Sequence, residues 1–233
     1  MASLRSTYLY LYNSILCSGW CYILYQATVT WLSGWSPAAT WEVVEIPLKI
    51  FQTAALLEVA HSLLGVVRAP LLTSVMQVAS RLWLLWGIVD AAPAAALTRY
   101  ERGLSIGTFS LPVGFHTMLM AWGLSEVIRY SFFSVKEWRT PYYWLTWLRF
   151  TGFLILYPVG VASEMAMVRL AYPAINDQRI FCFDMPNRVN FGLDYPFCCI
   201  VLTCLYLPGF PFLFSHMLRQ RAKILGPSSQ KQQ

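Results

Sequence analysis

Six long apolar segments, separated by short polar connections, constrain this chain more than any other feature. They cover approximately residues 8–32, 46–67, 71–89, 111–132, 144–170 and 195–217. A helix of about 20 apolar residues is long enough to cross the hydrocarbon core of a bilayer. Breaker-rich stretches such as SGWSP (33–37) and RTP (139–141) lie between the segments. We therefore predict an all-α polytopic membrane protein, a bundle of six transmembrane helices.

The composition agrees with a membrane solvent. Of the 233 residues, 57% are hydrophobic and 12% are charged, whereas a soluble domain carries about 25% charged residues. We find no internal repeat and no second domain, so residues 1–233 are predicted to form a single integral-membrane domain. The net charge of +6 comes from scattered basic residues without a basic stripe. This pattern argues against a nucleic-acid partner.

The charged residues of the connections predict the orientation. Six crossings place both termini on one side, where nine basic residues accompany a single acidic residue, Glu137. The connections on the other side carry six basic and seven acidic residues. Because positive charge marks the cytoplasmic face, we expect both termini to be cytosolic, including a tail at 218–233.

Cysteine and histidine residues give no sign of a metal site. The six cysteines form no CxxC pair, and the three histidines (61, 116 and 216) are far apart in the sequence. Neither pattern matches the ligand spacing of zinc sites. We expect no metal and no cofactor.

Several ionisable residues lie inside the predicted spans, where charge is costly and tends to mark function or an internal partner. Glu126 and Arg129, like Glu58 and His61, stand three residues apart and can meet on one helix face. Pairing between helices is sufficient to explain most such residues. The full set is Glu58, His61, Arg81, Glu126, Arg129, Arg149 and Glu164.

Tyr157 and Glu164 form a pair of a different kind. Seven residues are two helical turns, so the two side chains share a face roughly 10 Å apart along the axis. That is too far for a mutual hydrogen bond, but both groups can reach one small group between them. Pro158 and Gly160 loosen this part of the helix. An interfacial tyrosine and a glutamate paired with Arg169 or another arginine remain the alternative.

Residues 60–70, AHSLLGVVRAP, raise a second possibility. His61, Gly65 and Arg68 follow the protein tyrosine phosphatase signature His-Cys-x-x-Gly-x-x-Arg, but Ser62 stands at the nucleophile position. That chemistry needs a cysteine thiolate in a loop at a helix N-terminus, so we expect no phosphatase activity. An inactive phosphatase-like membrane scaffold or phosphotyrosine-binding protein is the alternative function, and a six-span transporter is a third.

Four stretches carry a family resemblance. They are QTAALLEVAHSLLGVVRAP (52–70), SEVIRYSFF (125–133), WLRFTGFLILYPVGVASE (147–164) and YLPGFPFLFSHMLRQR (206–221). With them the chain resembles the very-long-chain (3R)-3-hydroxyacyl-CoA dehydratases, the protein tyrosine phosphatase-like family, and most closely its plant PASTICCINO-type members. The resemblance implies the third step of fatty-acid elongation, removal of water from a 3-hydroxyacyl-CoA to give the trans-2-enoyl-CoA.

The resemblance also implies a catalytic pair. The tyrosine and glutamate of the family motif Tyr-Pro-x-Gly-x-x-x-Glu fall on Tyr157 and Glu164. Our hypothesis is that Glu164 takes the Cα proton and Tyr157 protonates the departing hydroxyl; the reverse assignment, or Glu164 in both roles, stays open. Each such group typically contributes about 10²–10⁴-fold in rate.

Four further residues are predicted to support this pair. Arg149, eight residues before Tyr157 on nearly the same face, is predicted to orient the thioester oxygen or to lower the pKa of the tyrosine. Gly160 is expected to keep the substrate channel open. Arg81 and Arg129 are predicted counter-ions of Glu164 or of the CoA phosphates.

The family sets the remaining expectations. The substrates are long and very-long-chain 3-hydroxyacyl-CoA molecules, and the location is the endoplasmic reticulum membrane. The expected partners are the condensing enzyme, the ketoacyl reductase and the enoyl reductase of the elongase. The C-terminal SSQKQQ lacks a dilysine retrieval pattern, so residence there is implied by the family alone.

Overall fold

The computed structural model describes residues 4–67, 70–98, 104–106, 109–111, 113–188 and 190–226. This part of the chain is almost entirely helical, with one short antiparallel hairpin that pairs Leu104 with Leu111. The elements are α1 (Leu4–Leu32), α2 (Pro37–Ala54), α3 (Leu56–Leu63), α4 (Leu71–Leu82), the π-helical η1 (Trp83–Val89), α5 (Pro93–Ala96), β1 (Leu104–Ile106), β2 (Phe109–Leu111), α6 (Phe115–Lys136), α7 (Tyr143–Thr151), α8 (Phe153–Asp177) and α9 (Tyr195–Leu225).

Each of the six predicted segments coincides with a helix or a pair of successive helices, but several of the predicted boundaries were wrong. The second helical region begins at Pro37 instead of residue 46, because Ser36 caps α2 by accepting a hydrogen bond from the Ala39 N–H and proline suits the first helical position. The fourth begins at Phe115, since residue 111 belongs to β2. The last continues to Leu225, so the first eight residues of the predicted tail are helical.

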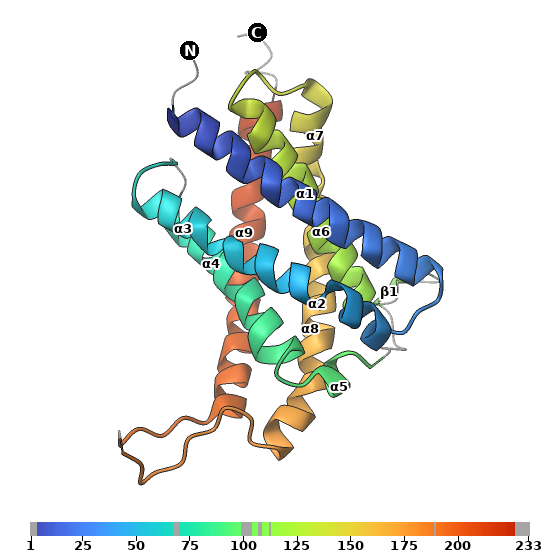
Figure 1. The fold of residues 1–233 in the computed structure, drawn as a ribbon, viewed down its shortest axis with the longest axis vertical. Coiled ribbons are helices and arrows are strands. Elements are labelled where there is room, and N and C mark those ends of the chain that lie inside the picture. Colours follow the sequence, from blue (N-terminus) through green and yellow to red (C-terminus); the bar gives the residue numbers. More distant parts are fainter. Residues whose placement is uncertain are drawn as a thin grey trace.

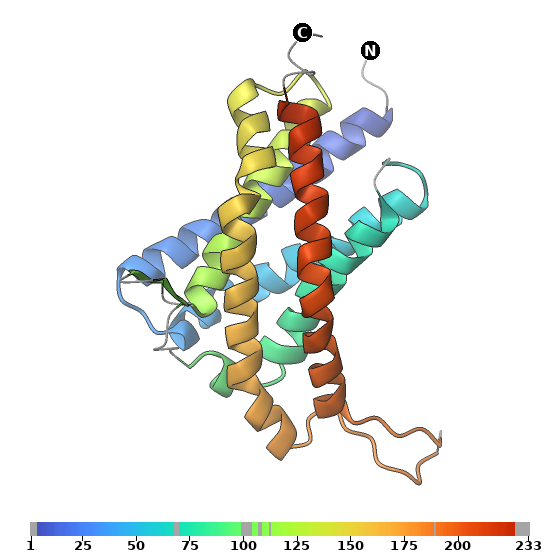
Figure 2. The same cartoon turned by 180° about the vertical axis from the view of Figure 1, so that it is seen from behind.

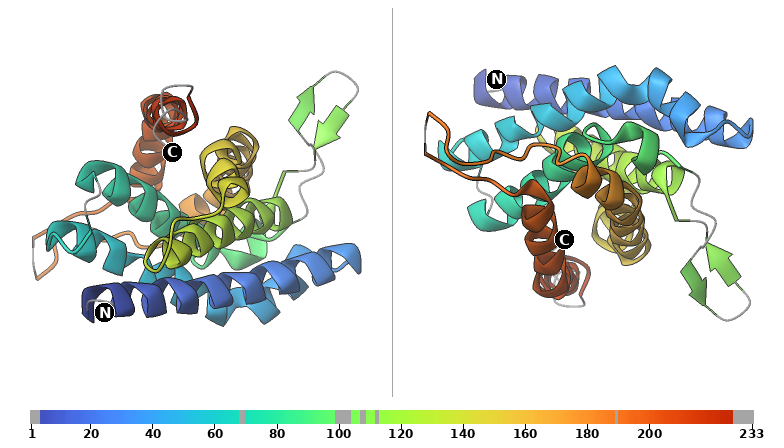
Figure 3. Two further views of the ribbon diagram at one scale, coloured as in Figure 1. Left: turned by 90° about the horizontal axis from the view of Figure 1, so that it is seen from above. Right: turned by 90° about the horizontal axis from the view of Figure 1, so that it is seen from below.

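The helices form a bundle whose centre is α6 (Figure 1). Seen along the long axis, α1 and α2 lie on one side of α6, and α8 and α9 lie on the other (Figure 3). The contacts of α6 with α1 and with α8 are the most extensive in the molecule. A side chain of α6 can therefore reach both sides of the bundle.

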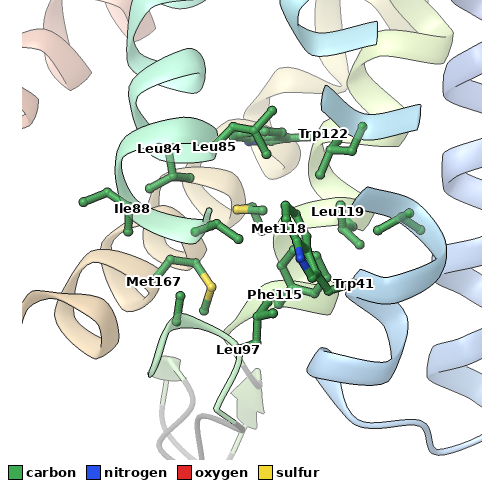
Figure 4. Close-up of a cluster of buried hydrophobic side chains, with 14 of the residues drawn as sticks. Trp41, Leu84, Leu85, Ile88, Leu97, Phe115, Met118, Leu119, Trp122 and Met167 are labelled. Carbon is green, nitrogen blue, oxygen red and sulfur yellow. The ribbon is translucent and has the colours of Figure 1, made fainter. Parts of the chain in front are cut away.

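A buried apolar cluster fills the space between α2, η1, α6 and α8 (Figure 4). It includes Trp41 of α2, Leu85 of η1, Met118 and Trp122 of α6, and Met167 of α8. Trp122 is only 1% exposed, so its indole ring is held firmly by its neighbours. Trp122 is also the member of this cluster that contacts the candidate site.

Three helical runs are long and apolar enough to cross a membrane, namely Leu71–Val89, Tyr143–Asp177 and Tyr195–Leu225. The second joins α7 to α8 through Gly152, whose N–H still donates to the Leu148 carbonyl at 2.8 Å. Large apolar side chains cover the outer surface of these helices, as the 72% exposure of Ile155 illustrates. A surface of this kind requires lipid, and the chain is a membrane protein.

Candidate active site

The carboxylate of Glu164 lies where three helices meet. Its side chain belongs to α8, and the residue is 6% exposed. Oε1 accepts a hydrogen bond from Nε1–H of Trp122 in α6 at 2.8 Å. Oε2 accepts one from the hydroxyl of Tyr206 in α9 at 2.9 Å. Because one donor holds each oxygen, the plane of the carboxylate is fixed.

Tyr157 lies two turns earlier on α8 and faces α9. Its ring stacks on Phe210 with a centroid distance of 5.1 Å and an interplanar angle of 8°, and on Phe214 at 6.3 Å. The hydroxyl makes no hydrogen bond to any residue of the described chain, whereas Glu164 has two. The ring is therefore held in place, and the O–H remains available to a bound molecule.

The guanidinium group of Arg81 lies over the face of the Trp122 indole ring. The guanidinium stands 5.1 Å from the ring centroid, forms an ion pair with Glu126 and donates to Ser125 Oγ at 3.3 Å. Its positive charge is near enough to act electrostatically on both Glu164 and Tyr157. Arg81 thus contributes positive potential to the site without bonding to either residue.

Arg129 belongs to a chain of alternating charges that leads away from the site. It pairs with Glu126 on its own helix, as the three-residue spacing predicted, and with Glu58 of α3. Arg81 closes the other end of the chain through Glu126. Arg81 therefore pairs with Glu126, and Arg129 pairs with both Glu126 and Glu58. Neither arginine forms an ion pair with Glu164. His61, which was predicted to pair with Glu58, instead forms a hydrogen bond with the Tyr8 hydroxyl at 2.8 Å.

Arg149 and Gly160 occupy different surroundings. The Arg149 guanidinium in α7 lies over the rings of Phe133 and Phe150, at 5.7 and 6.0 Å from their centroids. Gly160 is buried where α8 meets α6, and an added Cβ would lie 3.7 Å from that of Ala121. A Cβ at this distance makes an ordinary van der Waals contact, so the packing of the two helices does not by itself require glycine at position 160.

Two residues of the site were not predicted from the sequence. Trp122 and Tyr206 supply both hydrogen bonds to Glu164, yet an indole and a phenol in apolar segments look like ordinary core or belt residues. The only signal for Tyr206 was its place at the start of the stretch 206–221.

The phosphatase-like segment does not form a phosphate-binding loop at a helix start. His61 and Ser62 lie in the last turn of α3, which ends at Leu63. Arg68 lies outside the described residues. The part of this motif that is described closes a helix, whereas a phosphate-binding loop opens one.

The arrangement suits proton transfer. A carboxylate has about four acceptor positions, and two of those of Glu164 are occupied, so it can still take a proton from a bound molecule. The Tyr157 hydroxyl can give one. Within the described part of the chain, no three His, Cys, Asp or Glu side chains gather in a way that could hold a metal ion.

Comparison with known proteins identifies the family. The family described as "Protein tyrosine phosphatase-like protein, PTPLA" matches residues 52–227, about three quarters of the chain. The chain belongs to this family. The matched region includes every residue of the candidate site described above.

Relatives match over nearly the whole chain. The very-long-chain (3R)-3-hydroxyacyl-CoA dehydratase hpo-8 of Caenorhabditis elegans is 39% identical, covering 97% of this chain and 98% of its own. The dehydratase PASTICCINO 2B of Oryza sativa is 38% identical over 96% and 95%. Human very-long-chain (3R)-3-hydroxyacyl-CoA dehydratase 2 is 32% identical over 95% and 82%. No solved structure matches the chain.

Proposed function

We propose that this protein is a very-long-chain (3R)-3-hydroxyacyl-CoA dehydratase, a hydro-lyase of fatty-acid elongation. The observation that carries the proposal is the near full-length match to PTPLA relatives that bear this name. The structure supports it with a buried carboxylate and a phenol two turns apart on α8.

The proposed reaction is an acid–base elimination. Glu164 takes the proton from Cα, the electron pair forms the Cα–Cβ double bond, and the Cβ–O bond breaks. Tyr157 gives its proton to the departing hydroxide, which leaves as water. Water then carries the proton from Glu164 to the Tyr157 phenolate, since the two groups are too far apart for direct transfer, and this restores the starting state without consuming a cofactor.

The rigid surroundings of both groups support this assignment. Trp122 and Tyr206 orient the Glu164 carboxylate, and Phe210 stacks on the Tyr157 ring. A substrate held between them would place adjacent carbon atoms against an acid and a base at once. Such positioning accounts for a large part of enzymatic rate enhancement.

The length of α7 and α8 indicates the depth of the site. Arg149 and Arg169 are 20 residues apart on this run, or about 30 Å, close to the thickness of the hydrocarbon core. Tyr157 then lies about 12 Å from the level of Arg149. We propose that the CoA arm enters from the Arg149 end and that the acyl chain lies along the apolar helices.

We also propose the cellular setting that the family implies. The chain would cross the endoplasmic reticulum membrane six times with both termini in the cytosol. It would act there with the condensing enzyme, the ketoacyl reductase and the enoyl reductase.

The decisive experiment measures enoyl-CoA formation from a long-chain (3R)-3-hydroxyacyl-CoA by detergent-purified protein. Tyr157→Phe and Glu164→Gln should each lower kcat by about 10²–10⁴-fold, because each removes one proton-transfer group. Tyr172→Phe, the same change elsewhere on α8, serves as the control and should keep the wild-type rate.

Two other results would contradict parts of the proposal. An active wild type whose two variants remain nearly as active would show that the reaction is right and the residues are wrong. A folded but inactive wild type would contradict the dehydratase assignment and favour an inactive scaffold.

A further inference from the structure

We infer that Tyr206 of α9 is a positioning residue for Glu164, holding the carboxylate in the orientation that removes the Cα proton. The inference rests on the proposed function, because it assigns Tyr206 a part in that same reaction. The sequence motif provides site residues from α8 alone. Tyr206 adds α9 to the site, beside α8 and the α6 helix that carries Trp122.

The hydrogen bond is the first observation. The Tyr206 hydroxyl donates to Oε2 of Glu164 at 2.9 Å, within the normal range for O–H···O bonds. The other oxygen, Oε1, is already held by Trp122. Without Tyr206 the carboxylate would keep one anchor and could rotate about it.

The direction in which Tyr206 points is the second observation. Its neighbours Leu205 and Leu207 are 57% and 78% exposed and face the surrounding medium. Tyr206 is turned the other way, into the bundle, where its ring lies 6.2 Å from that of Trp83. A phenol turned inward in an apolar bundle requires a polar partner, and Glu164 is that partner.

The support of Tyr206 itself is the third observation. Its ring packs against Trp83, the first residue of η1, which directly follows α4. The Trp122 indole is supported in parallel by the guanidinium of Arg81, on α4. Both donors to the carboxylate therefore contact side chains of the same helical run, Leu71–Val89.

The geometry also separates the roles of the two tyrosines. The Tyr206 O–H is committed to Glu164, whereas the Tyr157 O–H bonds to nothing in the described chain. Tyr157 therefore remains the proton donor to the leaving group. Tyr206 acts through Glu164 and does not itself have to touch the substrate.

The test compares Tyr206→Phe with Tyr195→Phe. Tyr195 lies on the same face of α9, eleven residues earlier or about 16 Å along the axis. It too donates a hydrogen bond to a neighbouring helix, to the Gly87 carbonyl at 2.9 Å. The control thus matches the helix, the chemical change and the loss of an interhelical hydrogen bond, but its hydroxyl bonds to Gly87 and Trp83 and not to Glu164.

We expect Tyr206→Phe to lower kcat by about 10–100-fold, since a misplaced catalytic group costs rate more than binding. KM should change by less than about threefold, because this hydroxyl binds Glu164 and not the substrate. The primary deuterium isotope effect at Cα should rise, because proton abstraction becomes more fully rate-limiting. Tyr195→Phe should leave all three quantities near the wild-type values.

Several outcomes would overturn the inference. They are an isotope effect that does not change, a loss expressed mainly in KM, or equal losses in the two variants. If Tyr206→Phe does not fold, 3,5-difluorotyrosine at position 206 keeps the hydroxyl and changes only its strength as a donor. A kcat that then stays within about twofold of wild type would overturn the inference. Wild-type activity in the same assay tests the proposed function separately.

Discussion

Among the individual residues, Glu126 depends most strongly on its ion-pair partners. Its carboxylate is buried and binds two guanidinium groups, those of Arg81 and Arg129, while Glu58 neutralises the far end. Two positive and two negative charges therefore cancel inside an apolar bundle. This balance lets Arg81 stand next to Trp122 without an unpaired charge of its own.

Glu126→Gln should therefore destabilise the protein strongly. Removing one partner of a buried pair leaves uncompensated charge and costs about 3–5 kcal/mol. Asp184→Asn is the control, because the Arg179–Asp184 pair has side chains 54% and 78% exposed. An exposed pair contributes about 0–1 kcal/mol. Thermal unfolding in detergent measures both, and equal shifts in Tm would refute the argument.

The same residues show what a sequence can predict at this scale. The Glu126–Arg129 pair was predictable, because a three-residue spacing on one helix fixes the geometry. The pairs of Arg81 with Glu126 and of Glu58 with Arg129 were not, because they depend on how separate helices are placed against one another. The hydrogen bonds of Trp122 and Tyr206 to Glu164 could not be predicted for the same reason, because they also join separate helices.

Among the elements, α9 depends on a close contact with η1. The Tyr195 hydroxyl donates to the Gly87 carbonyl and accepts from Trp83 Nε1–H at 3.1 Å. A Cβ at position 87 would collide with that hydroxyl oxygen. Glycine is thus required at this position, because the phenol of the neighbouring helix occupies the space of a side chain.

Gly87→Ala and Tyr195→Phe should therefore show coupled effects. Gly87→Ala alone should lower Tm, because the hydroxyl must move and its hydrogen bonds are lost. In the double variant the obstructing oxygen is absent, so the loss should be smaller than the sum of the two single losses by about 0.5–3 kcal/mol. Thermal unfolding of the four proteins in detergent measures this difference. Strict additivity would mean that the two residues do not meet.

Helix positions were more predictable than helix ends. Long apolar runs located every major helix, since hydropathy depends on local composition alone. α2 begins nine residues earlier than predicted because of a single cap at Ser36. The pairing of β1 with β2 depends on hydrogen bonds between two short strands. Neither feature produces a long apolar signal.

At the scale of the whole molecule, the start of α1 and the end of α9 share one end of the bundle (Figure 1). The described residues of the connection between α8 and α9 (178–188 and 190–194) lie at the opposite end (Figure 2). Basic residues gather at the first end, including Lys136, Arg139, Arg219 and Lys223. Positive charge favours the cytoplasmic face, so this end should face the cytosol.

A protease-protection experiment tests this orientation. Epitope tags at both termini should be digested in sealed microsomes, because an even number of crossings returns the chain to the cytosolic side. A third tag inserted between Asn187 and Arg188, in the exposed connection before α9, should survive until detergent opens the membrane. Dehydratase activity of each tagged protein verifies its fold. Digestion of the internal tag together with both terminal tags would contradict the crossing of α8 and α9, and with it the entry of the CoA arm from the Arg149 end.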